Sequence, residues 1–596
     1  MSHSEASAIS NSYQLSKQSD PLKEQTTVAD ALRRLAPLMA DEKRSVWLAF
    51  VAVVVTSATS LLGPAMIAHT VDVDIKNGDF NGVLRSAAIL LGIYVCNLFA
   101  SYFQTQRMGT VGRRVLFNLR NAIFTRLQQL PLLFFNQNKA GDLISRINND
   151  TDKLNQFFSQ ALVQFASNLF LMAGAAISLL VMNPRLGLAT LAPAAGVLVL
   201  TRILSPWVRR RSVRSLQSLG GLSAEIQESL SNFRVIVAFN RIDYFRRKFD
   251  EANERNFKAS VSAGLASSIF MPVYTLAHSA AQVIVLAYGV TLIASQQASV
   301  GVLIGFLLYT NSFYMPLRHL AALWSSFQLS LAAIDRISEV LALESNMPVL
   351  PAGPVEPGPA LAFDHVSFAY PGGKRVLKDA TFALEPGKTY ALVGPTGGGK
   401  TTAASLMARL YDPVEGRVLL GGRDIRSYAP EERTRRIGFI LQEPFLFSGT
   451  IRDNILYGND EARNWSDEEL AGMLARKNLD TLLSRFEMGL ATPVRSVGDS
   501  ISLGQKQLVA FMRAVLKDPE ILILDEATAN IDTVTEQLLE EILRQLPATT
   551  TRVIIAHRLN TIANADEIFF INSGEIIPAG SMEHALHMLL HEKRES

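Results

Sequence analysis

The sequence predicts a chain of two parts: an α-helical membrane domain of six transmembrane helices with long cytoplasmic extensions, and an α/β domain with a phosphate loop. Three observations predict this fold class. Six apolar runs, each of roughly the 20 residues that a bilayer requires, lie between Trp47 and Ala322. A proline-rich linker follows them, and a glycine-rich loop ending in Lys-Thr stands in the part that comes after the linker.

The six apolar runs contain almost no charged residues, which argues against buried helices of a soluble protein. Arg202 lies near the end of its run, where its side chain can reach the membrane interface. Pro64, Pro193 and Pro272 would be costly in soluble helices but are tolerated in membrane helices. The runs are Trp47–Val71, Ala87–Gln106, Leu162–Met182, Leu186–Leu204, Leu265–Ile293 and Val300–Ala322.

The connections between the runs indicate the orientation. Long stretches rich in Arg and Lys join the second run to the third and the fourth to the fifth, whereas the other connections are short. The positive-inside rule places both long stretches, and both termini, in the cytoplasm. Because these stretches are patterned like helices, we expect the spanning helices to continue into them. The chain is thus expected to be a multi-pass protein of the cytoplasmic (inner) membrane, with its α/β domain in the cytoplasm.

Composition sets the domain boundaries. Residues 1–27 are polar, lack the apolar core of a signal peptide, and are expected to form a disordered tail. We expect the membrane domain over residues 28–345, the linker over 346–360 and the α/β domain over 361–596. The net charge of the 596-residue chain is only +3, so no nucleic-acid partner is indicated. The single cysteine, Cys96, cannot form an internal disulfide, and nothing indicates an oxidising compartment.

The stretch LVGPTGGGKT, Leu392–Thr401, fits the pattern G-x-x-x-x-G-K-[ST] between a buried strand and a helix. Glycines let backbone N–H groups turn toward phosphate oxygens, and the positive end of the helix dipole adds to the attraction. Lys400 is expected at the β- and γ-phosphates, and the Thr401 hydroxyl on Mg²⁺. The nucleotide-binding residues expected here are Gly394, Pro395, Thr396, Gly397, Gly398, Gly399, Lys400, Thr401 and Thr402.

Two further motifs follow the phosphate loop. ILILDEA is an apolar strand that ends in Asp525 and Glu526. Asp525 suits the Mg²⁺ shell, and Glu526 can orient and polarise an attacking water. ISLGQKQ places Ser502, Gly504 and Gln505 at the start of an amphipathic helix, which is a second anion site.

With these motifs in this order, the C-terminal region resembles the nucleotide-binding domain of an ATP-binding cassette (ABC) transporter. The whole chain resembles a bacterial half-transporter of the exporter type, which implies ATP and Mg²⁺ as cofactors. The resemblance implies that Tyr370 in VSFAYPG stacks on adenine, and that Gln442 in ILQEPF senses Mg²⁺ and the attacking water. It also implies that Asp532 lies in a loop that crosses between subunits, and that His557 contacts the γ-phosphate. Catalysis is thus expected from Glu526, His557 and Gln442.

The same resemblance implies how the chain assembles. ISLGQ matches the family signature, which binds the γ-phosphate of a nucleotide held by the opposite subunit, so two chains must meet head to tail. FFNQNKAGDLISRINND and IQESLSNFRVIVAFNR are similar to the family's two cytoplasmic loops, each with a short coupling helix that lies across a nucleotide-binding domain. The implied activity is an ATPase that exports amphipathic small molecules, lipids or peptides across the lipid bilayer by alternating access.

Alternatives remain open. An importer of the same fold and an ATP-gated pore or regulator that does not pump share these motifs, whereas a soluble ATPase of DNA repair has no spans. His278 lies inside the fifth run, where either a cavity or proton-linked role or a neutral hydrogen bond between helices is expected. Candidate residues lining a substrate cavity, each of which could equally pack between helices, are Tyr274, Phe306, Tyr309, Phe313 and Tyr314.

Two departures from the family pattern bear on the partner chain. Leu503 stands where the signature usually has glycine, and Ser496 stands where an acidic residue is common. The phosphate-loop half of the site is complete, whereas the signature half is altered. This asymmetry favours a heterodimer with a second half-transporter over a homodimer, although Ser502 and the Gly504 N–H remain available as phosphate donors.

Overall fold

The computed structural model describes residues 13–15, 42–353, 357–495, 501–525, 533–555, 564–580, 583–584 and 587. The chain divides into two compact units. The membrane unit comprises Ser16–Leu127 and Gly141–Ala342, and the nucleotide unit comprises Met1–Leu15, Gln128–Ala140 and Leu343–Ser596. Each unit is described by itself.

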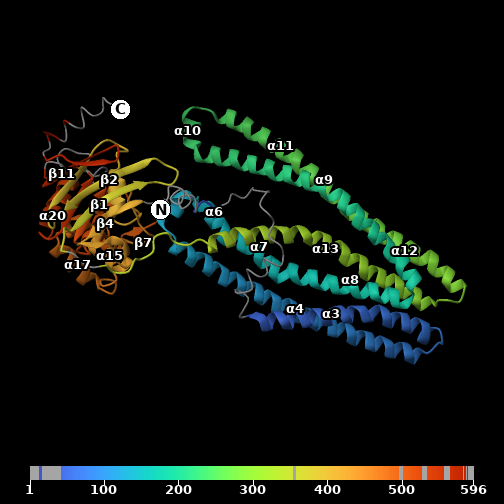
Figure 1. The fold of residues 1–596 in the computed structure, drawn as a ribbon. Coiled ribbons are helices and arrows are strands. Elements are labelled where there is room, and N and C mark those ends of the chain that lie inside the picture. The colour runs from blue at the N-terminus through green and yellow to red at the C-terminus, as the bar shows by residue number, and fades with distance from the viewer. Residues whose placement is uncertain are drawn as a thin grey trace. The chain divides into compact units, whose positions relative to one another are not determined.

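Long helices make up the membrane unit, as Figure 1 shows. All six predicted spans are confirmed as helices that are long and apolar enough to cross a membrane. The chain is therefore a multi-pass membrane protein. The elements are α3 (Lys43–His69), η2 (Thr70–Ile75), α4 (Phe80–Gln129), α6 (Ala140–Ser145), η3 (Arg146–Asp150), α7 (Thr151–Gln156), η4 (Phe157–Ala161), α8 (Leu162–Met182), α9 (Pro184–Ser231), α10 (Phe233–Ala238), α11 (Ile242–Ser268), α12 (Phe270–Ala294) and α13 (Val300–Leu341).

Several of these helices are much longer than a membrane is thick. Helix α4 contains 50 residues and α9 contains 48. At about 1.5 Å per residue each is roughly 70–75 Å long, whereas the hydrocarbon core is about 30 Å thick. The spanning helices thus continue beyond the bilayer, as the sequence predicts. Pro193 lies inside α9, whereas Pro272 is the third residue of α12, where a helix tolerates proline.

The nucleotide unit contains a six-stranded sheet in the order β12-β11-β3-β10-β9-β6. All neighbouring strands are parallel except β11 and β12. Every residue of β9 is buried, as expected for a strand in a parallel sheet covered on both faces. The strands are β3 (Thr389–Val393), β6 (Ile437–Ile440), β9 (Ile521–Asp525), β10 (Thr551–Ile555), β11 (Glu567–Asn572) and β12 (Glu575–Pro578).

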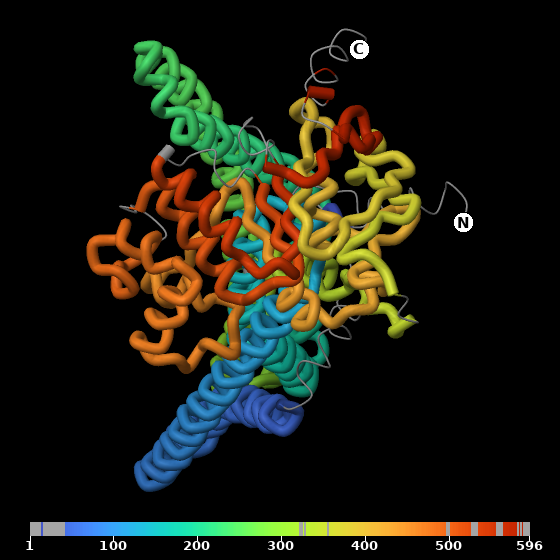
Figure 2. The backbone as a smooth tube through the Cα atoms, turned by 90° about the vertical axis from the view of Figure 1, so that its left-hand side faces the viewer, coloured from blue at the N-terminus to red at the C-terminus, as the bar shows by residue number. Residues whose placement is uncertain are grey.

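A second, four-stranded sheet has the order β2-β1-β4-β5, and one apolar core lies between the two sheets. A separate core joins the helices α16 to α19 to β6 and β9. Figure 2 shows the orange stretch around α17 on one side of the red strands and the yellow β1 and β2 on the other. The remaining strands are β1 (Leu361–Ala369), β2 (Arg375–Leu384), β4 (Glu415–Leu420), β5 (Arg423–Asp424), β7 (Gly449–Thr450) and β8 (Pro493–Val494). The helices are α14 (Lys400–Met407), η5 (Ile425–Ser427), α15 (Pro430–Arg436), α16 (Ile451–Ile455), α17 (Asp467–Arg476), α18 (Asp480–Leu483), η6 (Gly489–Ala491), α19 (Leu503–Val515) and α20 (Thr533–Gln545).

The tip of the first long connection belongs to the nucleotide unit, although the helices on either side belong to the membrane unit. This tip contains the short helix α5 (Leu132–Gln137). Phe134 is fully buried, and Leu133 packs against the core between the two sheets. Tyr13, from the segment expected to be a disordered tail, is also buried and lies edge-on to Phe134 with ring centroids 6.3 Å apart. Its hydroxyl donates to the Glu344 carbonyl at 2.7 Å, two residues before the linker expected over 346–360.

Candidate nucleotide-binding site

The predicted motifs lie at one edge of the six-stranded sheet. Strands β3, β10, β9 and β6 are parallel neighbours, so their carboxyl ends meet at the same edge. The phosphate loop follows β3, Gln442 follows β6 closely, and Asp525 ends β9. Ligands of such sheets bind outside this edge. Glu526, Asp532 and His557 lie outside the described residues, as does Ser496.

The phosphate loop has a backbone that only glycine accepts at critical points. Gly394 has φ +146° and Gly399 has φ +116°. A Cβ on Gly394 would lie 2.0 Å from the Ile571 carbonyl oxygen on β11, so the loop is packed directly against the neighbouring strand. The Lys400 ammonium donates to the carbonyls of Gly394 and Pro395, both at 3.0 Å, and is nearly buried. The loop thereby holds the Lys400 side chain near the start of α14, where the resemblance to ABC transporters implies that the phosphates bind.

Thr401 and Asp525 lie together although 124 residues separate them. The Thr401 hydroxyl donates to Asp525 Oδ1 at 3.3 Å, and Asp525 is 1% exposed. Thr401 lies in the first turn of α14 and Asp525 at the end of β9, so the parallel strand order brings them together. Hydroxyl and carboxylate oxygens are ligands that Mg²⁺ prefers. These two residues therefore fit a magnesium ion beside the phosphates.

Tyr370 lies just past the end of β1, half-buried. Its hydroxyl is 3.1 Å from Thr402 Oγ1, so it lies beside the helix that follows the phosphate loop. The Tyr370 ring is edge-on to Phe368 (5.0 Å) and to Tyr411 (5.5 Å). Packing from two aromatic rings thus fixes the plane of the ring that is expected to stack on adenine.

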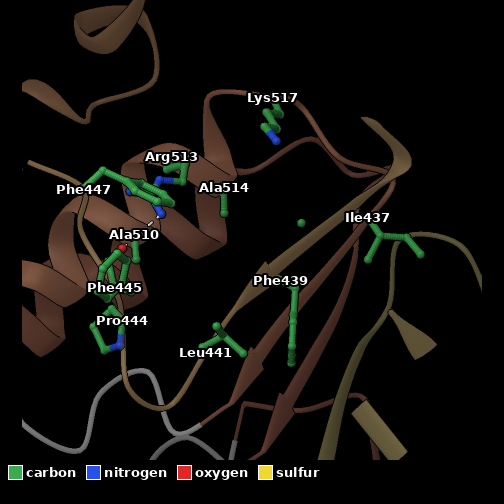
Figure 3. Close-up of a pocket in the computed structure, with 11 residues that line it drawn as sticks. Ile437, Phe439, Leu441, Pro444, Phe445, Phe447, Ala510, Arg513, Ala514 and Lys517 are labelled. Carbon is green, nitrogen blue, oxygen red and sulfur yellow. Dashed lines mark hydrogen bonds between the residues drawn. The ribbon is translucent and has the colours of Figure 1, made fainter. Parts of the chain in front are cut away.

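Gln442 is exposed and begins a loop beside a hollow between β6 and α19. Figure 3 shows Arg513 and Lys517 on one wall of this hollow and Phe439 and Leu441 on the other. Arg513 donates to the Phe445 carbonyl at 3.3 Å and to the Asn454 carbonyl at 2.8 Å, which ties the loop after β6 to α19 and α16. Burial lowers the pKa of Arg513, as expected for a guanidinium beside an apolar wall. Sequence reasoning missed this arginine because no local motif marks it.

The signature residues form the start of α19. The Ser502 hydroxyl accepts from the Gln505 N–H at 3.2 Å, and the Gln505 side chain accepts from the Ser502 N–H at 3.0 Å, which is a capping box. Gln505 also donates to the Arg485 carbonyl at 3.1 Å. Leu503 is 43% exposed at the first helical position, so its side chain is not part of the core. Beside Gly504 it presents an apolar group at the positive end of the helix.

Most of the candidate cavity residues pack between helices instead. Phe306, Tyr309, Tyr314 and Tyr274 are all buried within the membrane unit. The Tyr309 hydroxyl donates to the Leu61 carbonyl at 2.7 Å, and the Tyr314 hydroxyl to the Thr190 carbonyl at 2.8 Å. These tyrosines therefore join helices to one another. Phe313 is half-buried in the same clusters.

His278 differs from these tyrosines. It is half-buried, and its ring stacks on Tyr314 with centroids 5.6 Å apart. Its buried Nε2 has no hydrogen-bond partner among the described residues. The neutral hydrogen bond between helices that the sequence allowed is therefore not formed by Nε2 within this part of the chain.

The nucleotide unit has a phosphate loop and a Thr401–Asp525 pair suited to Mg²⁺ at the carboxyl edge of a parallel sheet. The membrane unit has six helices that are long and apolar enough to span a membrane. Together these features are typical of a membrane transporter driven by a nucleotide. Comparison with known proteins supports this class. Residues 46–317 match the family described as the ABC transporter transmembrane region, and residues 377–529 match the family described as ABC transporter. The chain therefore belongs to the ABC transporter family, as a half-transporter of the exporter type with an ATP-binding, ATPase domain.

Curated relatives match over most of their length. The chain is 34% identical over 562 residues to the uncharacterised ABC transporter ATP-binding protein YfiC of Bacillus subtilis, which covers 93% of this chain and 92% of the relative. It is 33% identical over 510 residues to a fatty acid ABC transporter ATP-binding/permease protein of Mycobacterium bovis (84% and 79%). It is 31% identical over 505 residues to a multidrug resistance ABC transporter ATP-binding and permease protein of Lactococcus lactis (83% of each).

Proposed function

We propose that this chain exports amphipathic compounds across the cytoplasmic membrane as one half of a dimer with two ATP sites. Each site joins the phosphate loop of one chain to the Ser502–Gln505 signature of the other, because each chain carries one of each. The observation that carries this proposal is the meeting of Thr401 with Asp525 at the edge where Lys400 also lies. ATP binding to the closed pair then supplies the energy for alternating access.

Within each site we assign the roles as follows. Lys400 holds the β- and γ-phosphates, and Thr401, Gln442 and Asp525 hold Mg²⁺, which when bound neutralises phosphate charge. Glu526 orients and polarises the attacking water, and His557 contacts the γ-phosphate. The exposed position of Gln442, just beyond the β6 edge, supports its share of this work.

The partner is proposed to be a different half-transporter. Leu503 places an exposed isobutyl group beside the phosphate donors of the signature. In a homodimer that group would be present at both sites, whereas a heterodimer leaves one site with an unaltered signature opposite the complete phosphate-loop half of this chain. A homodimer is the alternative that purification tests.

The substrate class is proposed from two sources. Relatives are named for fatty acids and for multidrug resistance, and both are amphipathic compounds. In this chain we assign the half-buried His278, whose Nε2 has no hydrogen-bond partner among the described residues, to a substrate cavity, since the tyrosines serve helix packing. Lipids and peptides belong to the same proposed class.

Transport direction tests the proposal. Inside-out vesicles containing this chain with a candidate partner should accumulate the fluorescent amphiphile Hoechst 33342 when ATP and Mg²⁺ are added, and Lys400→Ala vesicles should not. ATP-driven loss of the dye from preloaded vesicles would identify an importer. Steady ATP binding with no dye movement in either direction, for Hoechst 33342 and for a fluorescent fatty acid, would identify a pore or regulator.

A further inference from the structure

The charges within the six apolar runs of the membrane unit are all of one sign. These runs contain no Asp or Glu, so no carboxylate inside a run can pair with a cation there. A charged group at membrane depth is costly unless it has a partner. Basic groups without carboxylates therefore favour a ligand that brings the negative charge itself. The basic side chains in the runs are His69, Arg202, His278, Arg318 and His319.

Two of these side chains differ from the others in burial and lie at an informative depth. His278 and Arg318 are half-buried, whereas the other three are exposed. Counted from Val300 at 1.5 Å per residue, Arg318 lies about 27 Å from the outer end of α13. The hydrocarbon core is about 30 Å thick, so Arg318 lies near its inner end. The headgroups of the inner leaflet begin at this level.

The packing of α12 against α13 brings the two basic side chains together. The His278 ring stacks on Tyr314, with centroids 5.6 Å apart and planes at 22°. Tyr314 is 3% exposed and its hydroxyl donates to the Thr190 carbonyl, so the ring that carries His278 is fixed. Arg318 comes one turn after Tyr314 and thus lies on the same face of α13. It is close enough for its charge to act on the His278 imidazole.

Arg202 shows how an arginine at this depth is placed when it faces away from the packed helices. It lies about 27 Å from the outer end of α9, counted from Pro184, and its side chain is exposed. Such a side chain can reach the lipid headgroups along the helix surface. Arg318 instead shares a helix face with the buried Tyr314. Its guanidinium is therefore placed for a ligand between helices.

The His278 imidazole can add a hydrogen bond to such a ligand. Its Nε2 atom is buried and has no partner among the described residues. This nitrogen donates when it carries the ring proton, and a guanidinium offers two parallel N–H donors. A carboxylate or a phosphate accepts from both groups at once, whereas a neutral or cationic headgroup does not.

We propose that Arg318 and His278 bind the anionic headgroup of the exported amphiphile, so that amphiphiles with a carboxylate or phosphate headgroup are the preferred substrates. This inference rests on the proposed export function and specifies the charge of its substrate. The apolar side chains of the surrounding spans supply the surface for the acyl chain.

The test measures stimulation of ATPase activity in the full transporter, held in lipid nanodiscs. The probes are NBD-labelled dodecanoic acid, its uncharged methyl ester, NBD-labelled lysophosphatidic acid and the cationic amphiphile Hoechst 33342. The quantity compared is the mole fraction of probe in the bilayer at half-maximal stimulation. In the parent, the acid should act at a mole fraction about 10- to 100-fold lower than the ester, the range that hydrogen bonds to a charged group represent. The more effective of the acid and the lysophosphatidic acid identifies the preferred headgroup.

Four variants separate charge from packing. Arg318→Gln should raise the half-maximal value of the acid to that of the ester and leave the ester unchanged, which also shows that the variant is folded. Arg318→Lys should retain most of the preference for the acid. His278→Phe keeps a ring against Tyr314 but loses Nε2, and should weaken the preference by about 2- to 10-fold. Arg202→Gln is the matched control at the same depth and should retain the full preference.

The inference is overturned if the acid and the ester act equally in the parent, or if Hoechst 33342 acts at a lower mole fraction than both anionic probes. Export itself would stand in either case. It is also overturned if Arg318→Gln keeps the preference, or if Arg202→Gln loses it to the same extent, since the charge would then act from the lipid side. If no probe stimulates the ATPase and no dye moves in the vesicle test, the proposed export function is wrong and the inference fails with it.

Discussion

Substituting Gly394 by alanine tests whether the phosphate loop is held by its contact with β11. The new Cβ would lie 2.0 Å from the Ile571 carbonyl oxygen, about 1 Å closer than real Cβ atoms approach another atom. The residue would also have to keep φ +146°. Backbone strain of this kind costs about 1–3 kcal/mol, and overpacking adds a similar amount, for a total of about 2–6 kcal/mol.

Gly397→Ala is the matched control from the same loop. Gly397 has φ +82°, but a Cβ there meets nothing within 4 Å, so only the left-handed strain of about 1–2 kcal/mol applies. The assay is thermal unfolding of the purified transporter without nucleotide, where contact with phosphates plays no part. At roughly 2–4 °C per kcal/mol for a domain of this size, Gly394→Ala should lower the transition of the nucleotide unit clearly more than Gly397→Ala.

The activity of the Gly394 variant should fall as well. Relief of the clash moves the loop by about 1 Å, and a displacement of that size at a catalytic site can cost on the order of 10²-fold in rate. Equal unfolding temperatures for the two alanine variants would refute the reasoning, because the contact with β11 would then contribute nothing. ATPase activity of Gly394→Ala near that of the parent would refute the second part.

Three further outcomes are expected. Lys400→Ala removes the ammonium held over the loop carbonyls and should weaken ATP binding, as measured by equilibrium binding of a fluorescent ATP analogue; unchanged affinity would contradict the role. Glu526→Gln should retain ATP binding and trap the closed dimer, while hydrolysis falls by about 10²- to 10⁴-fold; near-normal turnover would argue against general-base action. The chain purified alone should show little substrate-stimulated ATPase activity. Leu503→Gly should raise this activity, because the substitution removes the exposed leucine side chain from the signatures of both chains of the homodimer. A stable homodimer of the unchanged chain with full stimulated activity would disprove the heterodimer.

Much of the fold follows from local sequence patterns. The six apolar runs are long and nearly uncharged, so only membrane helices suit them, and the structure confirms all six. The phosphate loop is equally local, since Gly394 and Gly399 specify a backbone that other residues avoid. The strand before the loop and the helix after it are predicted from the same short stretch. The resemblance to ABC transporters rests on such short stretches, so the sequence alone was enough to carry it.

The sequence assigned Thr401 and Asp525 to Mg²⁺, but the direct contact between them is a result of the tertiary structure. The hydrogen bond of Thr401 to Asp525 depends on β3, β10 and β9 being parallel neighbours, and nothing in either motif specifies that order. Likewise, Tyr309 and Tyr314 are residue types that could line a substrate cavity. In the structure, α13 is rotated so that their hydroxyls donate to backbone carbonyls on neighbouring helices. A sequence shows the spacing of apolar residues along a helix, but not which neighbouring element will cover each of its faces.

The hydrogen bond from Asn136 in α5 to the Tyr411 hydroxyl shows the same limit most clearly. Neither residue lies in a recognisable motif, and 275 residues separate them. Local sequence patterns predicted the six membrane helices, the phosphate loop with its flanking strand and helix, and the class of chemistry, because apolar period, backbone preference and phosphate geometry act over a few residues. Packing of the whole unit set the strand order, the rotation of α13 and the position of α5. Burial of apolar surface is non-directional, so the partners of an apolar face depend on the rest of the fold.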